Sequence, residues 1–132
     1  MLKITRKVEY ALIALRHMQQ SPNNSVSSAN QIASQYGIPQ HLLAKILQQM
    51  ARDGLIQAVK GPAGGYKIKA DLKKISLKDF FEKLEGPLGL MDCYFNTDCL
   101  QMKACNILSP IQKINQNMRE MFSKTTLLEI TQ

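Results

Sequence analysis

The stretch "SANQIASQYGIPQHLLAKILQQMARDG", residues 28–54, decides the fold. Ser28, followed three residues later by Gln31, predicts the start of a helix, because a serine hydroxyl accepts a hydrogen bond from a first-turn N–H. Gly37 predicts the end of that helix, since glycine adopts a left-handed backbone at no steric cost. Pro39 is tolerated in the first turn of a following helix. The stretch therefore predicts two helices joined by a tight turn, a helix-turn-helix.

The residues after this stretch predict a β-hairpin. "LIQAV" (55–59) and "GYKIK" (65–69) are short strand candidates, separated by "KGPAG". A hairpin that follows a helix-turn-helix is the wing of a winged helix. Its tip carries Lys60, Gly61 and, on the second strand, Lys67, a basic and glycine-rich group that suits phosphate contact and approach to the minor groove. The alternative is a plain solvated turn.

A winged helix predicts which residues would contact DNA. The second helix would lie in the major groove with its N-terminal residues, Gln40, His41 and Lys45, at the base edges. A glutamine amide can pair bidentately with adenine, and a lysine reaches guanine or a phosphate. Ser28, at the start of the first helix, and the wing residues complete the predicted interface. Its partner would be double-stranded DNA.

Further helices are predicted on both sides of this module. Residues 4–19 have apolar side chains spaced three and four apart, typical of an amphipathic helix. Ser76 and Asp79 form a capping pair before "LKDFFEKLEG", and Thr126 and Glu129 form another before "LLEI". The fold class is therefore mainly α, with a small two-stranded wing.

A narrow apolar seam predicts a long dimerisation helix near the C-terminus. Its residues alternate at spacings of four and three, the heptad period: Ile107, Ile111, Ile114, Met118 and Met121. The positions around the seam are polar and are predicted to face solvent, namely Gln112, Lys113, Asn115, Gln116, Asn117, Arg119 and Glu120. Such a seam suits pairing with one other helix, so a homodimer is predicted. Packing against the core of the same chain is the alternative.

Charge is distributed unevenly along the 132 residues, whose net charge is +7. Up to residue 74, eleven lysines and arginines stand against three carboxylates, a net charge of +8. A basic first part joined to a nearly neutral remainder suggests an anion-binding module that carries a second function. We therefore predict a DNA-binding domain at 1–74, a connecting helix and cysteine loop at 75–106, and a dimerisation helix with a short terminal helix at 107–132.

The sequence contains no membrane span and no catalytic motif. The apolar run "YALIAL" is too short for a secretion signal, and no stretch approaches the ~20 apolar residues that span a bilayer. We therefore expect a cytoplasmic protein without contact to a membrane. No His/Cys/Asp arrangement, phosphate loop or paired acids indicate an enzyme, so none is expected.

All three cysteines lie in "MDCYFNTDCLQMKAC" (91–105), six residues apart. On a helix this spacing spreads Cys93, Cys99 and Cys105 around the axis, and on a strand it separates them by about 20 Å. They converge only in a loop, which the polar composition favours. Four uses remain open: a disulfide with one thiol over, a metal-free redox dithiol, a zinc site without the usual short cysteine pairs, and an iron–sulfur cluster that needs a further ligand.

Three features together resemble the IscR/NsrR family of winged-helix iron–sulfur regulators: "LKITRKVEYAL" at the start, "GLIQAVKGPAGGYKI" at the wing, and the C-x₅-C-x₅-C loop. The likeness extends from residue 2 to about residue 130, including the "TLLEI" ending. The resemblance implies a homodimer on a palindromic operator, with a [2Fe–2S] or [4Fe–4S] cluster held by Cys93, Cys99 and Cys105. Cluster occupancy or redox state would then change the affinity for DNA.

The chain departs from the family pattern at several positions. Members with a [2Fe–2S] cluster carry a histidine three residues after the last cysteine, where this chain has Leu108. Members that sense nitrosative stress use a carboxylate near the start of the N-terminal helix, predicted here at 4–19; the partner subunit donates it to a [4Fe–4S] cluster, and Glu9 matches it. Asp92 and Asp98 are further candidates for this ligand. Lys60 replaces the usual wing arginine and lacks its planar fork.

The expected function is therefore that of a regulator sensing redox state, nitric oxide or iron through this cluster. Two rivals remain: a DNA-binding regulator with a metal-free thiol sensor, and a small cluster-carrier or electron-transfer protein.

Overall fold

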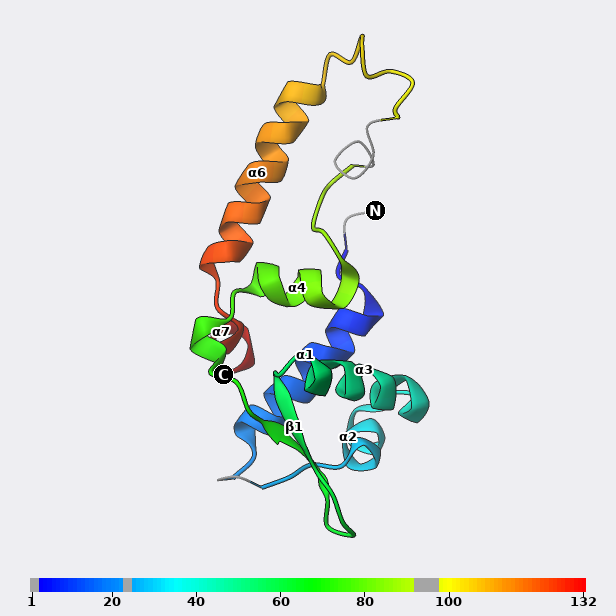
Figure 1. The fold of residues 1–132 in the computed structure, drawn as a ribbon, viewed down its shortest axis with the longest axis vertical. Helices are drawn as coiled ribbons and strands as arrows, with labels where there is room; N and C mark the ends of the chain where they lie inside the picture. Colours follow the sequence, from blue (N-terminus) through cyan, green and yellow to red (C-terminus); the bar gives the residue numbers. More distant parts are fainter. Residues whose placement is uncertain (1–2, 23–24, 92–97) are drawn as a thin grey trace.

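The computed structural model describes residues 3–22, 25–91 and 98–132, and it is mainly helical (Figure 1). Cys93 and Asp92 therefore lie outside the described residues. The elements in chain order are α1 (Arg6–Gln20), α2 (Ala29–Tyr36), α3 (Gln40–Arg52), β1 (Ile56–Val59), β2 (Gly65–Ile68), η1 (Leu72–Lys74), α4 (Leu77–Glu85), α6 (Leu108–Lys124) and α7 (Leu127–Thr131). The order confirms the predicted winged helix-turn-helix with a long helix after it.

Local capping chemistry sets the helix-turn-helix. The Ser28 hydroxyl accepts a hydrogen bond from the Gln31 N–H at 3.0 Å and starts α2. Gly37 ends α2 with φ +66°, the left-handed conformation expected of it. Ile38 then turns into the core at 5% exposure, which fixes the angle between α2 and α3.

The hairpin is antiparallel, with Ile56 opposite Ile68 and Val59 opposite Gly65. Its outer edge is joined by Ser27, whose N–H donates to the Tyr66 carbonyl at 3.0 Å and whose carbonyl accepts from the Tyr66 N–H at 2.8 Å. Since the next residue caps α2, this bridge sets the position of the wing relative to the helix-turn-helix.

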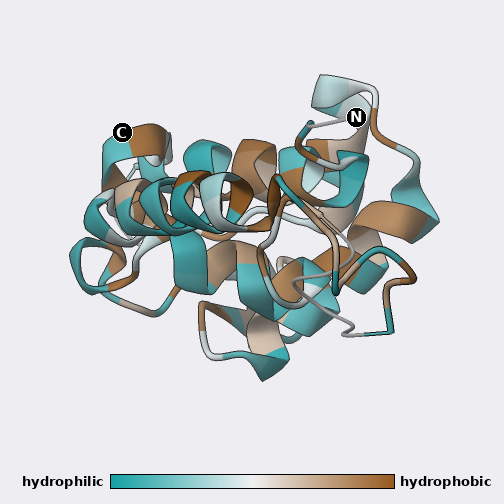
Figure 2. Ribbon diagram, turned by 90° about the horizontal axis from the view of Figure 1, so that it is seen from above, coloured by the Kyte–Doolittle hydropathy of each residue, from teal (hydrophilic) through white to brown (hydrophobic). Residues whose placement is uncertain are grey.

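A single core joins the N- and C-terminal elements. The helix predicted at 4–19 begins at Arg6, with Thr5 as its cap. Its buried face packs against α3 and α4, and also against α7, where Leu127 is fully buried. Hydrophobic and hydrophilic residues alternate within single helices, as amphipathic helices require (Figure 2). The proposed division at residues 74 and 106 stays a prediction.

Helix α6 extends away from the winged helix, so the described part of the cysteine loop lies at one end of the molecule and the wing tip at the other (Figure 1). Two of its positions were predicted wrongly as solvent-facing. Asn115 is 6% exposed, and the Arg119 side chain is only 20% exposed. Both face the chain's own α4 and the segment after it, because they form hydrogen bonds to these elements.

Candidate nucleic-acid interface and cysteine pocket

Helix α3 presents a polar face on the side away from the core. Gln40, His41 and Lys45 are exposed, whereas Leu43, Ile46 and Leu47 are buried. Gln48, one turn beyond Lys45, is exposed on the same helix. Gln48 was not among the predicted DNA contacts, although its i+3 spacing from Lys45 places it on the same helix face.

The wing tip adds a second exposed basic group. Lys60 and Gly61 are exposed, and Gly61 has φ +114°. Lys67 lies on β2 and is half-buried, so its side chain is less free than that of Lys60. Ser28 is half-buried, and its hydroxyl is engaged in capping α2.

The two described cysteines share one pocket. Cys99 is exposed and Cys105 half-buried, and both thiols are free. Together with Met91, Asp98 and Leu108 they line a pocket of ≈ 640 Å³ beside the start of α6. The Cys99 Sγ donates to the Gln101 Oε1 at 3.5 Å. The loop therefore brings Cys99 and Cys105 to the lining of one hollow, and convergence of the three thiols stays a prediction.

Glu9 does not line this pocket within the described part of one chain. It lies on the first turn of α1, where its carboxylate pairs with the Arg6 guanidinium at 3.2 Å. The start of α1 lies beside α4 (Figure 1), held there by the Lys7 ammonium, which donates to the Leu84 carbonyl at 2.9 Å. The Glu9 side chain is 42% exposed, and its ion-pair partner Arg6 is 79% exposed.

The pocket supplies two of the cysteines that an iron–sulfur cluster would need as ligands. Two free thiols line one hollow, with the third cysteine in the adjoining segment. Among residues 3–22, 25–91 and 98–132, no group of three or more His, Cys, Asp or Glu side chains converges as a metal site. A complete ligand set therefore needs Cys93 and a donor from elsewhere.

The apolar seam of α6 is exposed on the isolated chain. Ile107, Ile114 and Met121 are 49%, 52% and 55% exposed, while Ile111 and Met118 between them are half-buried. Helix α6 contacts the rest of the chain through Asn115, Arg119 and Phe122 rather than through the seam. Pairing of the seam with a second helix stays a prediction.

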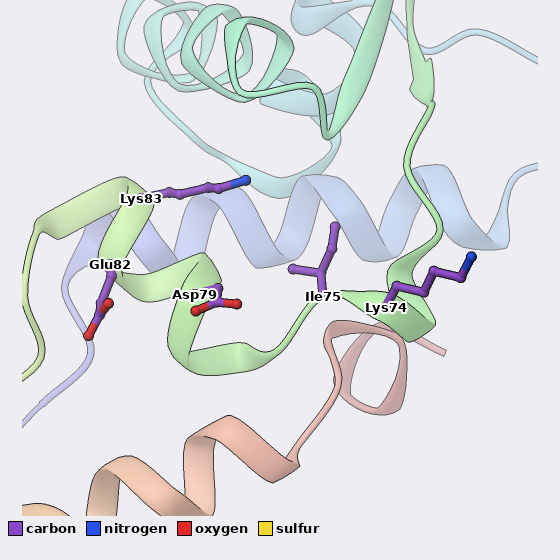
Figure 3. A pocket seen from close by; sticks show the side chains of 5 residues that line it. All are labelled: Lys74, Ile75, Asp79, Glu82 and Lys83. Atoms are coloured by element: carbon purple, nitrogen blue, oxygen red, sulfur yellow. The ribbon is translucent and has the colours of Figure 1, made fainter.

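Two other hollows are polar. One of ≈ 420 Å³ beside α4 is lined by Lys74, Ile75, Asp79, Glu82 and Lys83 (Figure 3). Its two lysines and two carboxylates balance, so it favours neither anion nor cation. The other, of ≈ 480 Å³, lies between the end of α1 and α2, where His17 Nδ1 and the Tyr36 hydroxyl are 2.9 Å apart. Neither hollow adjoins the cysteines.

A family model described as "Rrf2: Iron-dependent Transcriptional regulator" matches residues 4–132. The chain belongs to the Rrf2 family. Members of this family are transcriptional regulators. No helix in the described part of the chain is long and apolar enough to cross a membrane.

Solved Rrf2-type structures share this fold. CymR (YrzC), titled the global cysteine regulator of B. subtilis, is 24% identical with a TM-score of 0.77, covering 99% of this chain and 97% of its own. T. potens IscR is 24% identical with a TM-score of 0.71, covering 98% and 85%. Staphylococcus aureus CymR in an oxidized form is 22% identical with a TM-score of 0.70, covering 96% and 93%. These similarities establish the fold.

Proposed function

We propose that this Rrf2 protein is a cytoplasmic, homodimeric DNA-binding regulator that senses redox state, nitric oxide or iron through an iron–sulfur cluster held by its cysteine loop. The observation that carries the proposal is the shared pocket of Cys99 and Cys105 beside the start of α6, the helix with the exposed apolar seam. The proposed sensing loop would thus adjoin the proposed dimer surface.

The DNA-binding part of the proposal rests on exposed polar groups on two elements. Gln40, His41 and Lys45 of α3 would contact base edges, and Lys60 and Gly61 of the wing would contact the backbone. Lys67 would add charge, and Ser28 would bring the start of α2 to a phosphate. A two-fold dimer implies a palindromic operator with half-sites about one or two helical turns apart.

The cluster-binding part assigns Cys93, Cys99 and Cys105 as thiolate ligands and Glu9 of the partner subunit as the fourth. Leu108 replaces the histidine of the alternative ligand set, which favours [4Fe–4S] over [2Fe–2S]. When bound, the cluster would supply an iron centre that responds to oxygen, nitric oxide and iron supply. The protein's own part is to hold the thiolates together and to carry Glu9 on a helix fixed against α4.

Anaerobic native mass spectrometry, combined with absorbance spectroscopy, tests this proposal. We expect a dimer that carries one cluster per chain. The Glu9→Ala variant should lose cluster or change its spectrum, and the matched control is Asp79→Ala, which removes a first-turn carboxylate of α4 outside the pocket. Colourless anaerobic protein without iron would contradict cluster binding, and an unchanged cluster load in Glu9→Ala would remove Glu9 from the ligand set.

A metal-free thiol sensor is the second candidate, favoured by one observation. Cys99 and Cys105 are free thiols that line the same pocket, and Cys99 is exposed. Similarity to CymR, the global cysteine regulator of B. subtilis, is compatible with this function. Thiol oxidation would then alter DNA affinity in iron-free protein, and unchanged affinity on oxidation would exclude the thiol sensor.

A cluster-carrier or electron-transfer function predicts no salt-dependent binding to duplex DNA, so a salt titration of duplex binding separates it from both regulator functions.

A further inference from the structure

The segment that leads into the cysteine loop is held by two side chains of α6. The Leu90 N–H donates to Asn115 Oδ1 at 2.9 Å. One turn further along α6, Arg119 Nη1 donates to the Leu88 carbonyl at 2.8 Å. These contacts join the chain just before the loop to the helix just after it, so both ends of the loop are anchored on α6. We call the hydrogen bonds of Asn115 and Arg119 to Leu90 and Leu88 the loop support.

Arg119 also joins this support to α4. Its Nη1 lies 2.8 Å from Glu82 Oε1, and the pair is largely shielded from solvent. A charged hydrogen bond in such a position is short and directional. One residue further along α4, the Lys83 carbonyl accepts from the Gln49 Nε2 of α3 at 3.0 Å.

Helix α4 therefore contacts the loop support on one side and the predicted recognition helix on the other. The two contacts use different groups: Glu82 accepts from Arg119 through its carboxylate, whereas Lys83 accepts from Gln49 through its backbone carbonyl. The start of α1 is fixed to the same helix by Lys7 and Leu84. A displacement of the loop support would thus move α4 relative to α1 and α3, the two helices of the DNA-binding module that it contacts.

We propose that Asn115 and Arg119 are positioning residues that couple the state of the cysteine loop to helix α3. The proposal deepens the function proposed above and rests on its DNA-binding part. The route runs from the loop through Leu88 and Leu90 to the Asn115–Arg119 pair, and from there through α4 to Gln49. Allosteric coupling requires such an element with two arrangements that both sites bias.

The chemistry of the pair favours positioning over simple packing. Apolar side chains at 115 and 119 would fill the same space, but they would not select one register of the loop segment against α6. Hydrogen bonds to a backbone N–H and a backbone carbonyl do select it, because a shift of one residue leaves buried polar groups without partners.

Coupling is reciprocal, so bound DNA must change the loop as the loop changes DNA binding. This allows a test in iron-free, reduced protein. The alkylation rate of Cys99 and Cys105 by N-ethylmaleimide is measured by mass spectrometry, with and without an operator duplex that the protein selects from a random-sequence library. The duplex would bind at the opposite end of the molecule from the loop (Figure 1), so direct shielding is avoided.

We expect DNA to change the wild-type alkylation rate about fivefold or more, and the Asn115→Ala/Arg119→Ala double variant to reduce that change to less than about twofold. The matched control is Gln116→Ala/Glu120→Ala, an exposed pair with the same spacing on α6, whose side chains hydrogen-bond at 3.2 Å. The control should keep the wild-type ratio. The single variant Arg119→Lys, which keeps the charge, should retain a larger DNA-dependent change in alkylation rate than the double variant.

The proposal is overturned if DNA leaves the wild-type rates unchanged, if the double variant keeps the wild-type ratio, or if the control loses it equally. Should the double variant not fold, either single variant that folds and keeps the full ratio overturns it. Failure of the cluster proposal gives a different result: no cluster assembles, while the DNA-dependent alkylation and its loss in the variant persist.

Discussion

The close approach of the wing to the start of α2 makes Gly65→Ala the most informative single substitution. A methyl group at Gly65 would lie 2.5 Å from the Ser27 carbonyl oxygen and 2.8 Å from the Ser28 nitrogen. These are backbone atoms and cannot rotate away, so the bridge between Ser27 and Tyr66 has to open. Its two hydrogen bonds, of 2.8 and 3.0 Å, contribute about 0.5–1.5 kcal/mol each.

We therefore expect Gly65→Ala to lower the free energy of unfolding by about 1–3 kcal/mol. Displacing the Ser28 cap would add about 1 kcal/mol. The loss should be at the upper end of the range, because Ser27 is only 2% exposed and its backbone groups would be left without partners. Duplex affinity should fall with stability, since the wing is no longer held against α2.

Urea unfolding and amide hydrogen exchange measure the two consequences separately. The exchange rate of the Ser27 and Tyr66 amides should rise in Gly65→Ala. Gly37→Ala is the control: Gly37 has φ +66° and open space around it, so this variant should lose about 1–2 kcal/mol through backbone strain alone. Its Tyr66 amide should stay protected. An unchanged unfolding midpoint and unchanged Tyr66 exchange in Gly65→Ala would refute the reasoning.

Four further substitutions test the interfaces and the cysteine pocket. Ile114→Asp places a charge in the exposed seam of α6 and should give a monomer in sedimentation velocity; a dimer would contradict the assigned interface. Lys60→Ala should reduce the slope of log affinity against log salt by about one without changing base preference, and an unchanged slope would remove Lys60 from the phosphate contacts. Gln40→Ala should instead weaken discrimination at one base pair by about 1–3 kcal/mol, measured by competition with single-base operator variants. Cys105→Ser should abolish cluster assembly while leaving apo-protein stability nearly unchanged, since the residue lies at the surface of a pocket.

Local patterns made most of the fold predictable. The Ser76 hydroxyl accepts from the Asp79 N–H at 3.1 Å, as the capping pair indicated. Thr126 and Glu129 form both hydrogen bonds of a capping box before α7. Such signals are reliable because donor and acceptor lie three residues apart, so the sequence alone brings them together.

The register of α6 was only half predictable. The apolar period correctly indicated a narrow exposed seam, but it also implied that every other polar position faces solvent. A second stripe, formed by Asn115, Arg119 and Phe122, faces the chain's own α4 and the segment after it instead. Two polar members hide this stripe from any hydropathy pattern, since their burial depends on partners distant in sequence.

The hydrogen bonds that the sequence did not reveal are the ones that join the elements to one another. Ser27 connects the wing to α2, Gln49 connects α3 to α4, and Arg119 connects α4 to α6. Each pairs residues at least 34 positions apart in the chain, so no local pattern specifies it. Capping and periodicity determine which elements exist, whereas these contacts determine how a change in one element displaces the next. A regulator depends on the second property, and for this reason its switching residues are found among buried polar groups between elements rather than in the motifs that identify the fold.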